Sequence, residues 1–373
     1  MMIDVENLIE YLNEIDIDFF CGVPDSQLSS FCDYVEENCS NIIAANEGNA
    51  VGIAAGYYLS TGRFPLVYLQ NSGLGNIVNP VTSLTHSKVY SIPIIYVIGW
   101  RGQPGVHDEP QHKKQGEVTL DLLELLDIKY TVINKDSSLD DLRDEFNNEF
   151  LPQLNIGESV AIVVSKNTFE NYKIKKSNDN TLTREEAIQM VSSFLNEEDI
   201  IVSTTGKISR ELFEYREDNK QGHGNDFLTV GSMGHSSSIA LGVALSSDKK
   251  IFCFDGDGSL LMHMGSLALI GSKKPENFYH ILFNNSAHES VGGLPTVMSN
   301  IDINNLILSC KYENVFNASN SEELKEILPK FLSSNGPVFL NINVDISSRK
   351  DLGRPTTPPI ENKNDFMKKL QGG

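Results

Sequence analysis

The hydrophobic positions of the chain follow two patterns, one typical of helices and one typical of buried strands. Val5, Leu8, Ile9, Leu12 and Ile15 recur at steps of three and four residues, which predicts an amphipathic helix. Short apolar runs of strand length then alternate with helical stretches, at 19–22, 42–44, 66–69, 92–98 and 160–164. Near-continuous apolar strands separated by helices predict a parallel sheet buried on both faces.

A polar segment then divides the chain. After it, Thr183 with Glu186 three residues later matches a capping box and predicts the start of a helix. The alternation resumes, with strands predicted at 200–203, 227–230, 251–254, 280–283 and 338–342. We therefore predict a first domain at 1–170, a linker at 171–182, a second domain at 183–346 and a C-terminal tail at 347–373.

The second half repeats landmarks of the first half. The run PLVYLQNSG ends at Gly73 and the run KIFCFDGDG ends 185 residues later, at Gly258. Two glycines eight residues apart, Gly48 and Gly56, have counterparts 186 residues later. The alternative is two unrelated α/β domains that have strand ends and glycines at similar positions. We expect two similar open parallel-sheet α/β domains, without a middle domain, that bind a ligand at the carboxyl ends of their strands.

Composition and charge exclude several classes of protein. Lys and Arg number 30 against 50 Asp and Glu, a net charge of −20, which argues against nucleic acid or an anionic membrane as the main partner. The N-terminus lacks the basic region of a signal peptide, and the longest apolar run, 92–100, is too short to span a bilayer. The five cysteines form no CxxC pair and no zinc-like spacing, which suits reduced thiols. We expect a cytoplasmic protein.

The most specific motif of the chain is a pair of short segments at two strand ends. Gly256-Asp257-Gly258 follows one apolar strand and Asn284-Asn285 ends the next, with 25 residues between them. Parallel neighbours joined by a helix bring both segments to the same edge of a sheet. There the Asp257 carboxylate and the Asn285 amide oxygen suit one hard divalent cation, and Gly256 and Gly258 let a diphosphate approach the backbone.

This spacing is similar to the diphosphate-binding motif of thiamine diphosphate enzymes. Nine ordered stretches over nearly the whole chain, among them AANEGNAVGIAAGY, DGDGSLLMHMGSLALIG and NNSAHESVGGLPTV, resemble the thiamine diphosphate-dependent 2-keto acid decarboxylase family. The resemblance implies thiamine diphosphate and Mg²⁺ as cofactors, with Asp257, Asn285 and the Ala287 carbonyl as metal ligands. Ser286 stands where we expect glycine, which leaves Asn285 in place but bears on the conformation of the loop.

Glu47 follows a predicted strand and opens a helix of small residues. Its position matches the activating glutamate of the family, whose carboxylate switches the cofactor's aminopyrimidine to the imino form, so that thiazolium C2 loses its proton. The alternative is an acidic residue stabilised by the helix dipole. Because the chain also contains the metal-binding motifs, we expect Glu47 to be catalytic.

Two glycine-rich loops of the second half resemble cofactor-binding loops of the family. Gly231 and Met233 match the loop whose apolar side chain holds the cofactor in its bent shape, and Gly206 matches the earlier diphosphate-side loop. A methionine that only packs in the core is the alternative for Met233.

The resemblance implies nonoxidative decarboxylation of 3-phosphonopyruvate to phosphonoacetaldehyde and CO₂, in phosphonate biosynthesis. Such a substrate carries about three negative charges, so this acidic protein needs local basic groups to bind it. Arg101, Lys207 and His288 are the candidates for substrate binding, with a solvated surface charge as the alternative for each. Asp25 occupies the place of a proton-transfer acid, or is a helix N-cap before Gln27.

His112 lies in the segment that resembles the family's substrate-side loop, and it is the other candidate catalytic residue. In the family, the two halves of one active site come from different subunits. We therefore expect a homo-oligomer, at least a dimer, with Glu47 of one chain opposing Asp257 of another.

Three alternatives stay open. One is the same cofactor chemistry on sulfopyruvate, in which a sulfonate replaces the phosphonate. A second is an oxidoreductase with the same cofactor, against which the lack of cluster-binding cysteines argues. The third is a nucleotide-binding regulatory protein. Gly73 and Gly75 suggest a dinucleotide-binding loop, but Val78 stands where the third glycine of GxGxxG is needed.

Overall fold

The computed structural model describes residues 2–372 and divides into two compact units, Met1–Lys175 and Lys176–Gly373. The division lies within the segment 171–182 for which the sequence predicts a linker. None of the helices between residues 2 and 372 combines the length and the apolar character needed to cross a bilayer.

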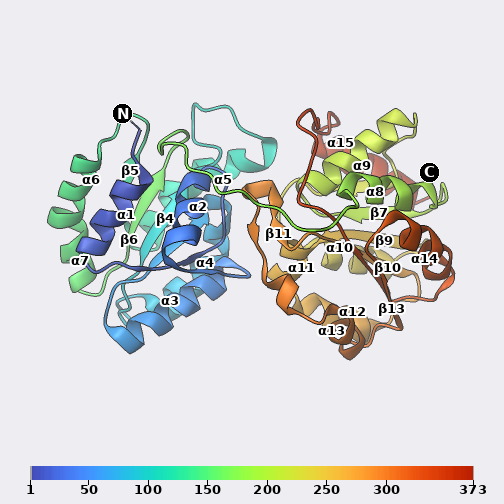
Figure 1. Cartoon of the computed structure of the whole chain (residues 1–373), viewed down its shortest axis with the longest axis horizontal. Helices are drawn as coiled ribbons and strands as arrows, with labels where there is room; N and C mark the ends of the chain where they lie inside the picture. Colours follow the sequence, from blue (N-terminus) through green and yellow to red (C-terminus); the bar gives the residue numbers. More distant parts are fainter. Residues whose placement is uncertain (1, 373) are drawn as a thin grey trace. The chain divides into compact units, whose positions relative to one another are not determined.

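The first unit is built on one six-stranded sheet with helices between its strands (Figure 1). All neighbouring strands are parallel, in the order β2-β1-β3-β4-β6-β5. The strands are β1 (Phe19–Gly22), β2 (Ser40–Ile43), β3 (Leu66–Gln70), β4 (Ile95–Gly99), β5 (Lys129–Ile133) and β6 (Val160–Val164). The helices are α1 (Val5–Glu14), α2 (Ser29–Asn38), α3 (Glu47–Thr61), α4 (Leu74–Pro80), α5 (Pro110–Leu125), α6 (Leu139–Glu145) and α7 (Leu151–Asn155), with the short turns η1 (Asn71–Gly73), η2 (Val81–Thr85) and η3 (Phe146–Phe150).

The second unit contains a second six-stranded parallel sheet, in the order β13-β14-β10-β9-β7-β8 (Figure 1). Its strands are β7 (Ile200–Ser203), β8 (Asp226–Leu228), β9 (Ile251–Gly256), β10 (Phe278–Asn284), β13 (Asn314–Ala318) and β14 (Val338–Asn343), and β11 (Ala287–His288) pairs antiparallel with β12 (Leu294–Pro295). The helices are α8 (Arg184–Ser193), α9 (Lys207–Asp218), α10 (Ser236–Ala244), α11 (Asp257–Met262), α12 (Gly265–Lys273), α13 (Ile303–Ser309), α14 (Ser321–Ser333) and α15 (Pro359–Leu370), with the short turns η4 (Glu289–Val291) and η5 (Val297–Asn300).

The two sheets have the same topology. Read from β8, the second sheet runs β8-β7-β9-β10-β14-β13, so its successive strands occupy the same places as those of the first sheet. The predicted fold class, two similar parallel-sheet α/β domains, is confirmed. The predicted capping box is also present, because Thr183 and Glu186 bond reciprocally at the start of α8.

Both faces of the second sheet are buried, as its apolar strand sequences predict. In β9, Phe252 and Phe254 join a core cluster with α8, α9 and α14, whereas Ile251 and Cys253 join a cluster with α10, α12 and α13. Successive side chains of a strand point to opposite faces, so a strand covered on both sides must be apolar throughout.

Of the strands in the two parallel sheets, the sequence prediction missed two, β5 and β13. Each lies at the edge of its sheet, and in each only the last residue is buried. Because an edge strand is partly solvated, KYTVI and NVFNA contain polar residues and form no continuous apolar run. The ends of other strands also differ, since β4 begins at Ile95 instead of 92 and β8 spans Asp226–Leu228 instead of 227–230.

The C-terminal tail packs against the opposite edge of the second sheet. The side chain of Asn362 in α15 accepts from the backbone N–H of Leu228 at 3.1 Å and donates to the carbonyl of Asp226 at 2.8 Å. These bonds satisfy backbone groups of β8, the edge strand, so α15 protects that edge from pairing with another chain.

Candidate active site

Glu47 opens α3, directly after the N-cap residue Asn46, whose side chain accepts from Asn49 N–H at 2.9 Å. The Glu47 side chain is buried, and its Oε2 accepts from Asn76 Nδ2 at 2.6 Å. Gly73 lies against the same carboxylate, since a Cβ there would be 2.4 Å from Oε1. Glu47 lies in the first turn of α3, where the helix dipole favours a carboxylate, and its burial and its contact with Asn76 are additional to that effect.

Asp25 is a buried acid in the loop after β1. Its Oδ2 accepts from the backbone N–H of Gln27 at 3.2 Å, and its Oδ1 has no hydrogen-bond partner within residues 2–372. Burial raises the pKa of Asp25 to about 6, although the positive charge of Arg101 opposes the shift. Helix α2 begins at Ser29 with Leu28 as its N-cap, so the N-cap alternative for Asp25 is wrong.

Arg101 and His112 share one carboxylate that the sequence reasoning missed. Arg101 donates from Nε and Nη2 to Asp108 at 2.8 and 2.6 Å, and His112 Nδ1 lies 2.8 Å from Asp108 Oδ1. Arg101 Nη1 also donates to the hydroxyl of Ser26, the residue after Asp25, at 2.9 Å. The guanidinium and the imidazole are thus held by one acid.

The surroundings lower the pKa values of both Asp108 and His112, for different reasons. Burial would raise the pKa of Asp108, but hydrogen bonds from Arg101 and His112 hold it well below its usual range. Burial lowers the pKa of His112, and the hydrogen bond to Asp108 only partly offsets that effect. Asp108 is therefore ionised at neutral pH.

In the second unit, the structure brings the two predicted strand-end motifs together. Strands β9 and β10 are parallel neighbours, with Phe283 opposite Gly256. Asp257 begins α11, directly after β9, and Asn285 follows the end of β10. The predicted adjacency of the motifs is confirmed.

The Asp257 carboxylate is buried and accepts from the Thr296 hydroxyl at 2.5 Å. Burial raises the pKa of Asp257 to about 6, against hydrogen bonds from Thr296 and from backbone N–H groups that include Gly258 and Ala287. Asn285 Oδ1 accepts from Ala287 N–H at 3.0 Å. A carboxylate, an amide oxygen and a backbone carbonyl are hard oxygen donors of the kind that Mg²⁺ prefers, so these residues fit such a cation.

Met233 and His288 both lie against Gly258 of the GDG motif. A Cβ on Gly258 would lie 2.9 Å from His288 Nδ1 and 3.1 Å from Met233 Cε. Burial lowers the pKa of His288 to about 4, so its imidazole is neutral at physiological pH. Met233 follows Gly231 and Ser232 in the loop after β8.

Gly206 and Lys207 begin α9 beside the loop that follows β10. Gly206 has a φ of 98° and is the N-cap of α9, and a Cβ there would lie 2.7 Å from Ser290 Oγ. The Lys207 ammonium donates to Glu289 Oε1 at 2.8 Å. The predicted substrate cation Lys207 is thus paired with a carboxylate, as Arg101 is.

Ser286 has a φ of 55°, in the left-handed region that favours glycine. Its backbone N–H and its hydroxyl bond Asn284 Oδ1 at 3.1 and 3.2 Å. Glycine, which the sequence analysis expects here, adopts such a φ without strain, and two local hydrogen bonds help the serine to adopt it.

The second unit also contains a buried cluster of possible metal ligands and a cavity, and neither is part of the candidate active site. Cys253, Asp255 and His280 form a buried cluster whose potential ligand atoms all lie within 4.8 Å of one another. The Asp255 carboxylate is 3.3 Å from His280 Nε2 and accepts from the backbone N–H of Gly256 at 3.0 Å.

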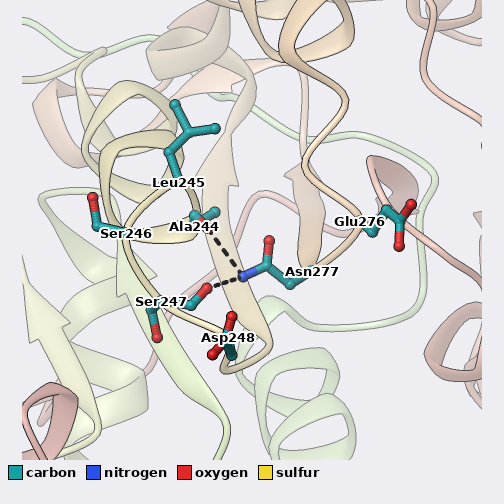
Figure 2. A pocket seen from close by; sticks show the side chains of 7 residues that line it. All are labelled: Ala244, Leu245, Ser246, Ser247, Asp248, Glu276 and Asn277. Atoms are coloured by element: carbon teal, nitrogen blue, oxygen red, sulfur yellow. Dashed lines mark hydrogen bonds between the residues drawn. The ribbon is translucent and has the colours of Figure 1, made fainter.

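A cavity lies at Ala244–Asp248 and Glu276–Asn277, where Asn277 donates to the carbonyls of Ala244 and Ser247 (Figure 2). Because β9 and β10 begin beside this cavity, it lies at the opposite end of the strands from the GDG motif.

Comparison with known proteins matches both units. Residues 5–125 match the thiamine pyrophosphate enzyme N-terminal TPP binding domain, and residues 204–342 match the thiamine pyrophosphate enzyme C-terminal TPP binding domain. Phosphonopyruvate decarboxylases from Streptomyces viridochromogenes and Streptomyces hygroscopicus are each 32% identical over 96% of this chain, covering 93% and 92% of those proteins. Sulfopyruvate decarboxylase from Methanosarcina acetivorans is 29% identical over 90% of both chains.

Proposed function

Because the chain belongs to the thiamine pyrophosphate-dependent decarboxylase family, we propose that it converts 3-phosphonopyruvate to phosphonoacetaldehyde and CO₂. The observation that supports this choice of substrate is the 32% identity, over 96% of the chain, to two phosphonopyruvate decarboxylases. The reaction breaks the bond between the carboxyl and keto carbons, and a proton takes the place of the lost CO₂. No oxidant is consumed, and the product suits a step of phosphonate biosynthesis.

Thiamine diphosphate is the cofactor of this family, and we propose Mg²⁺ as its metal. Asp257, Asn285 and the Ala287 carbonyl would hold the cation, and the loops containing Gly206, Gly231, Met233, Gly256 and Gly258 would bind the cofactor. When bound, thiamine diphosphate supplies a nucleophilic carbon and an electron sink for the departing carboxylate.

Glu47 would hold the proton that is exchanged with the aminopyrimidine. Its Oε2 is bonded to Asn76 at 2.6 Å, so Oε1, on the side of Gly73, is the oxygen that we assign to this exchange. Burial of the carboxylate keeps bulk water from competing for that proton.

Asp25 and His112 are the proposed groups for proton transfer at the product carbon. A carboxyl with a pKa of about 6 is partly protonated near neutral pH and can donate a proton, whereas an imidazole with a lowered pKa is neutral and can accept one. Arg101, bonded to Ser26 and Asp108 between these groups, is the proposed ligand of the phosphonate, with Lys207 and His288 as further candidates.

We also propose a homo-oligomer, at least a dimer, in which Glu47 of one chain and Asp257 of another share a site. Two largely apolar helices support this proposal. In α3, Gly52 and Gly56 have open space around them and Leu59 is 71% exposed, and in α10, Gly242 is equally open beside the 55% exposed Leu245. Apolar helix faces of this kind favour close packing against another protein surface.

Complementation tests the shared site. Glu47→Gln and Asp257→Ala are each expected to be inactive. In a mixed dimer made by co-expression, one site contains both changes and the other contains neither, so activity returns. No recovery in dimers shown to be mixed would mean that each site is built from one chain.

Substrate competition tests the activity itself. The purified protein with thiamine diphosphate and Mg²⁺ is given phosphonopyruvate, sulfopyruvate and pyruvate in parallel, and aldehyde and CO₂ are measured. We expect phosphonopyruvate to give the highest kcat/KM, with activity lost when a chelator removes Mg²⁺. The 29% identical relative is named sulfopyruvate decarboxylase. If this protein prefers sulfopyruvate, the proposed cofactor chemistry stands and the proposed substrate is wrong. No turnover of any keto acid would refute the proposal.

A further inference from the structure

Glu289 is an acid with a largely buried side chain that connects three segments of the second unit. It lies in η4, four residues after Asn285, with only 9% of its side chain exposed. Its Oε1 accepts from Lys207 Nζ at 2.8 Å, and its Oε2 accepts from Asn285 Nδ2 at 3.0 Å and from the guanidinium of Arg184. The carboxylate therefore contacts the starts of α8 and α9 and the loop after β10.

These contacts determine the orientation of the Asn285 amide, that is, the directions in which its nitrogen and its oxygen point. Glu289 Oε2 is an acceptor for the Arg184 guanidinium and for Asn285 Nδ2 at 3.0 Å, so the amide presents its NH₂ group to Glu289. The Oδ1 atom then lies on the other side, where it accepts from Ala287 N–H at 3.0 Å. Both ends of the amide thus agree on one orientation, in which the oxygen is on the side of Ala287.

The surroundings hold Glu289 in place and balance its charge. Arg184 also binds Glu211 through Nε and Nη2, at 2.8 and 2.6 Å. Two cations and two carboxylates therefore form one group of ion pairs, and the side chains of Arg184, Glu211 and Glu289 are all at least nine-tenths buried. Lys207 and Arg184 therefore hold the two oxygens of Glu289 in place, with Oε2 beside the amide nitrogen of Asn285.

We propose that Glu289 is a positioning residue that orients Asn285 so that its amide oxygen, and not its amide nitrogen, faces a divalent cation bound at Asp257. The inference rests on the proposed function, because it requires a cation at Asp257 and Asn285. Residues that hold metal ligands in this way typically contribute about 10- to 100-fold to metal affinity.

Glu289→Ala and Glu289→Gln test this role through Mg²⁺ binding without substrate. The dissociation constant of Mg²⁺ is measured by calorimetry with thiamine diphosphate present. Glu289→Ala removes the acceptor, so the amide is free to flip, and we expect about 10- to 100-fold weaker Mg²⁺ binding. Glu289→Gln keeps an accepting oxygen for Asn285, so most of the affinity should return.

Glu211→Gln is the matched control. It changes the other buried carboxylate on Arg184, but Glu211 has no hydrogen bond with Asn285 among residues 2–372. We expect its Mg²⁺ affinity to equal that of the unchanged protein. Equal weakening in Glu211→Gln and Glu289→Ala would mean that the whole ion-pair group matters, and not the contact with Asn285, and would overturn the proposal.

Two further comparisons distinguish a loss of folding from a loss of Mg²⁺ affinity, and a failure of this inference from a failure of the proposed function. If Glu289→Ala does not fold, Glu289→Met keeps the volume of the side chain and carries the same expected loss of affinity. Unchanged Mg²⁺ affinity in a folded Glu289→Ala or Glu289→Met variant would overturn the inference while the decarboxylase assignment stands. An unchanged protein that neither binds Mg²⁺ with thiamine diphosphate nor turns over a keto acid would instead refute the proposed function.

Discussion

Replacing Asp25 with asparagine should stabilise the first unit more at high pH than at low pH. Asp25 is completely buried, and burial raises its pKa from 3.8 to about 6. For an acid whose pKa is raised on folding, the folded state favours the protonated form. Its contribution to stability is therefore fully present below the unfolded pKa and is lost as the pH rises through about 6.

The size of the effect follows from the same two pKa values. The rise of the pKa from 3.8 to about 6 corresponds to about 3 kcal/mol of lost stability at pH 7 and above. At pH 5 the loss is only about half as large, because the folded carboxyl is still largely protonated. Asparagine does not titrate, so the stability difference between Asp25→Asn and the unchanged protein should grow by roughly 1 kcal/mol between pH 5 and pH 8.

The single tryptophan of the chain makes this measurable. Trp100 is buried in the first unit, so its fluorescence follows the unfolding of the unit that contains Asp25. Urea titrations of both proteins at pH 5 and pH 8 give the two differences in free energy of unfolding. Any constant packing cost, such as an unpaired amide N–H at the place of Oδ1, cancels in the comparison.

A stability difference that stays the same at both pH values would refute this reasoning. It would mean that the Asp25 carboxyl titrates alike in the folded and unfolded states. A difference that shrinks with rising pH would require a lowered pKa in the folded protein, and the proposed proton donor would then be ionised at neutral pH.

Three further changes test the site. Glu47→Gln should lower kcat about 100-fold or more, while calorimetry still detects thiamine diphosphate and Mg²⁺ binding; normal turnover would remove Glu47 from proton exchange. Gly73→Ala places a Cβ 2.4 Å from Glu47 Oε1 and should reduce kcat and destabilise the first unit by about 1–3 kcal/mol, whereas Gly75→Ala, with open space around it, should do neither. Asp108→Asn removes the acid that raises the pKa of His112, so NMR titration should find that pKa lower still, and an unchanged value would contradict the contact.

Much of the active site could be predicted from local sequence, because its residues lie at strand ends. The apolar runs that end at Gly256 and Asn284 predict adjacent parallel strands, and the structure pairs β9 with β10 in that way. Glu47 was identifiable for the same reason, since it begins a helix directly after a strand. In a parallel α/β sheet, chain order and strand direction determine which loops share an edge.

The partners of these residues could not be predicted in this way. Thr296, which bonds Asp257, is 39 residues away, and Arg184, which bonds Glu289, is 105 residues away. Asp108 lies within the segment that resembles the family's substrate-side loop, but nothing in the spacing of its neighbours indicates that one carboxylate binds both Arg101 and His112.

By itself, the sequence determined the α/β class, the duplication and the main site residues, because hydrophobic period and strand-end position are local properties of the chain. Only the tertiary structure decided the edge strands β5 and β13, the burial that raises the pKa of Asp25, and the contacts of Glu289 with Asn285 and Arg184. Those properties depend on which surfaces are removed from water and on distances between segments far apart in the chain, and no local pattern of residues contains that information.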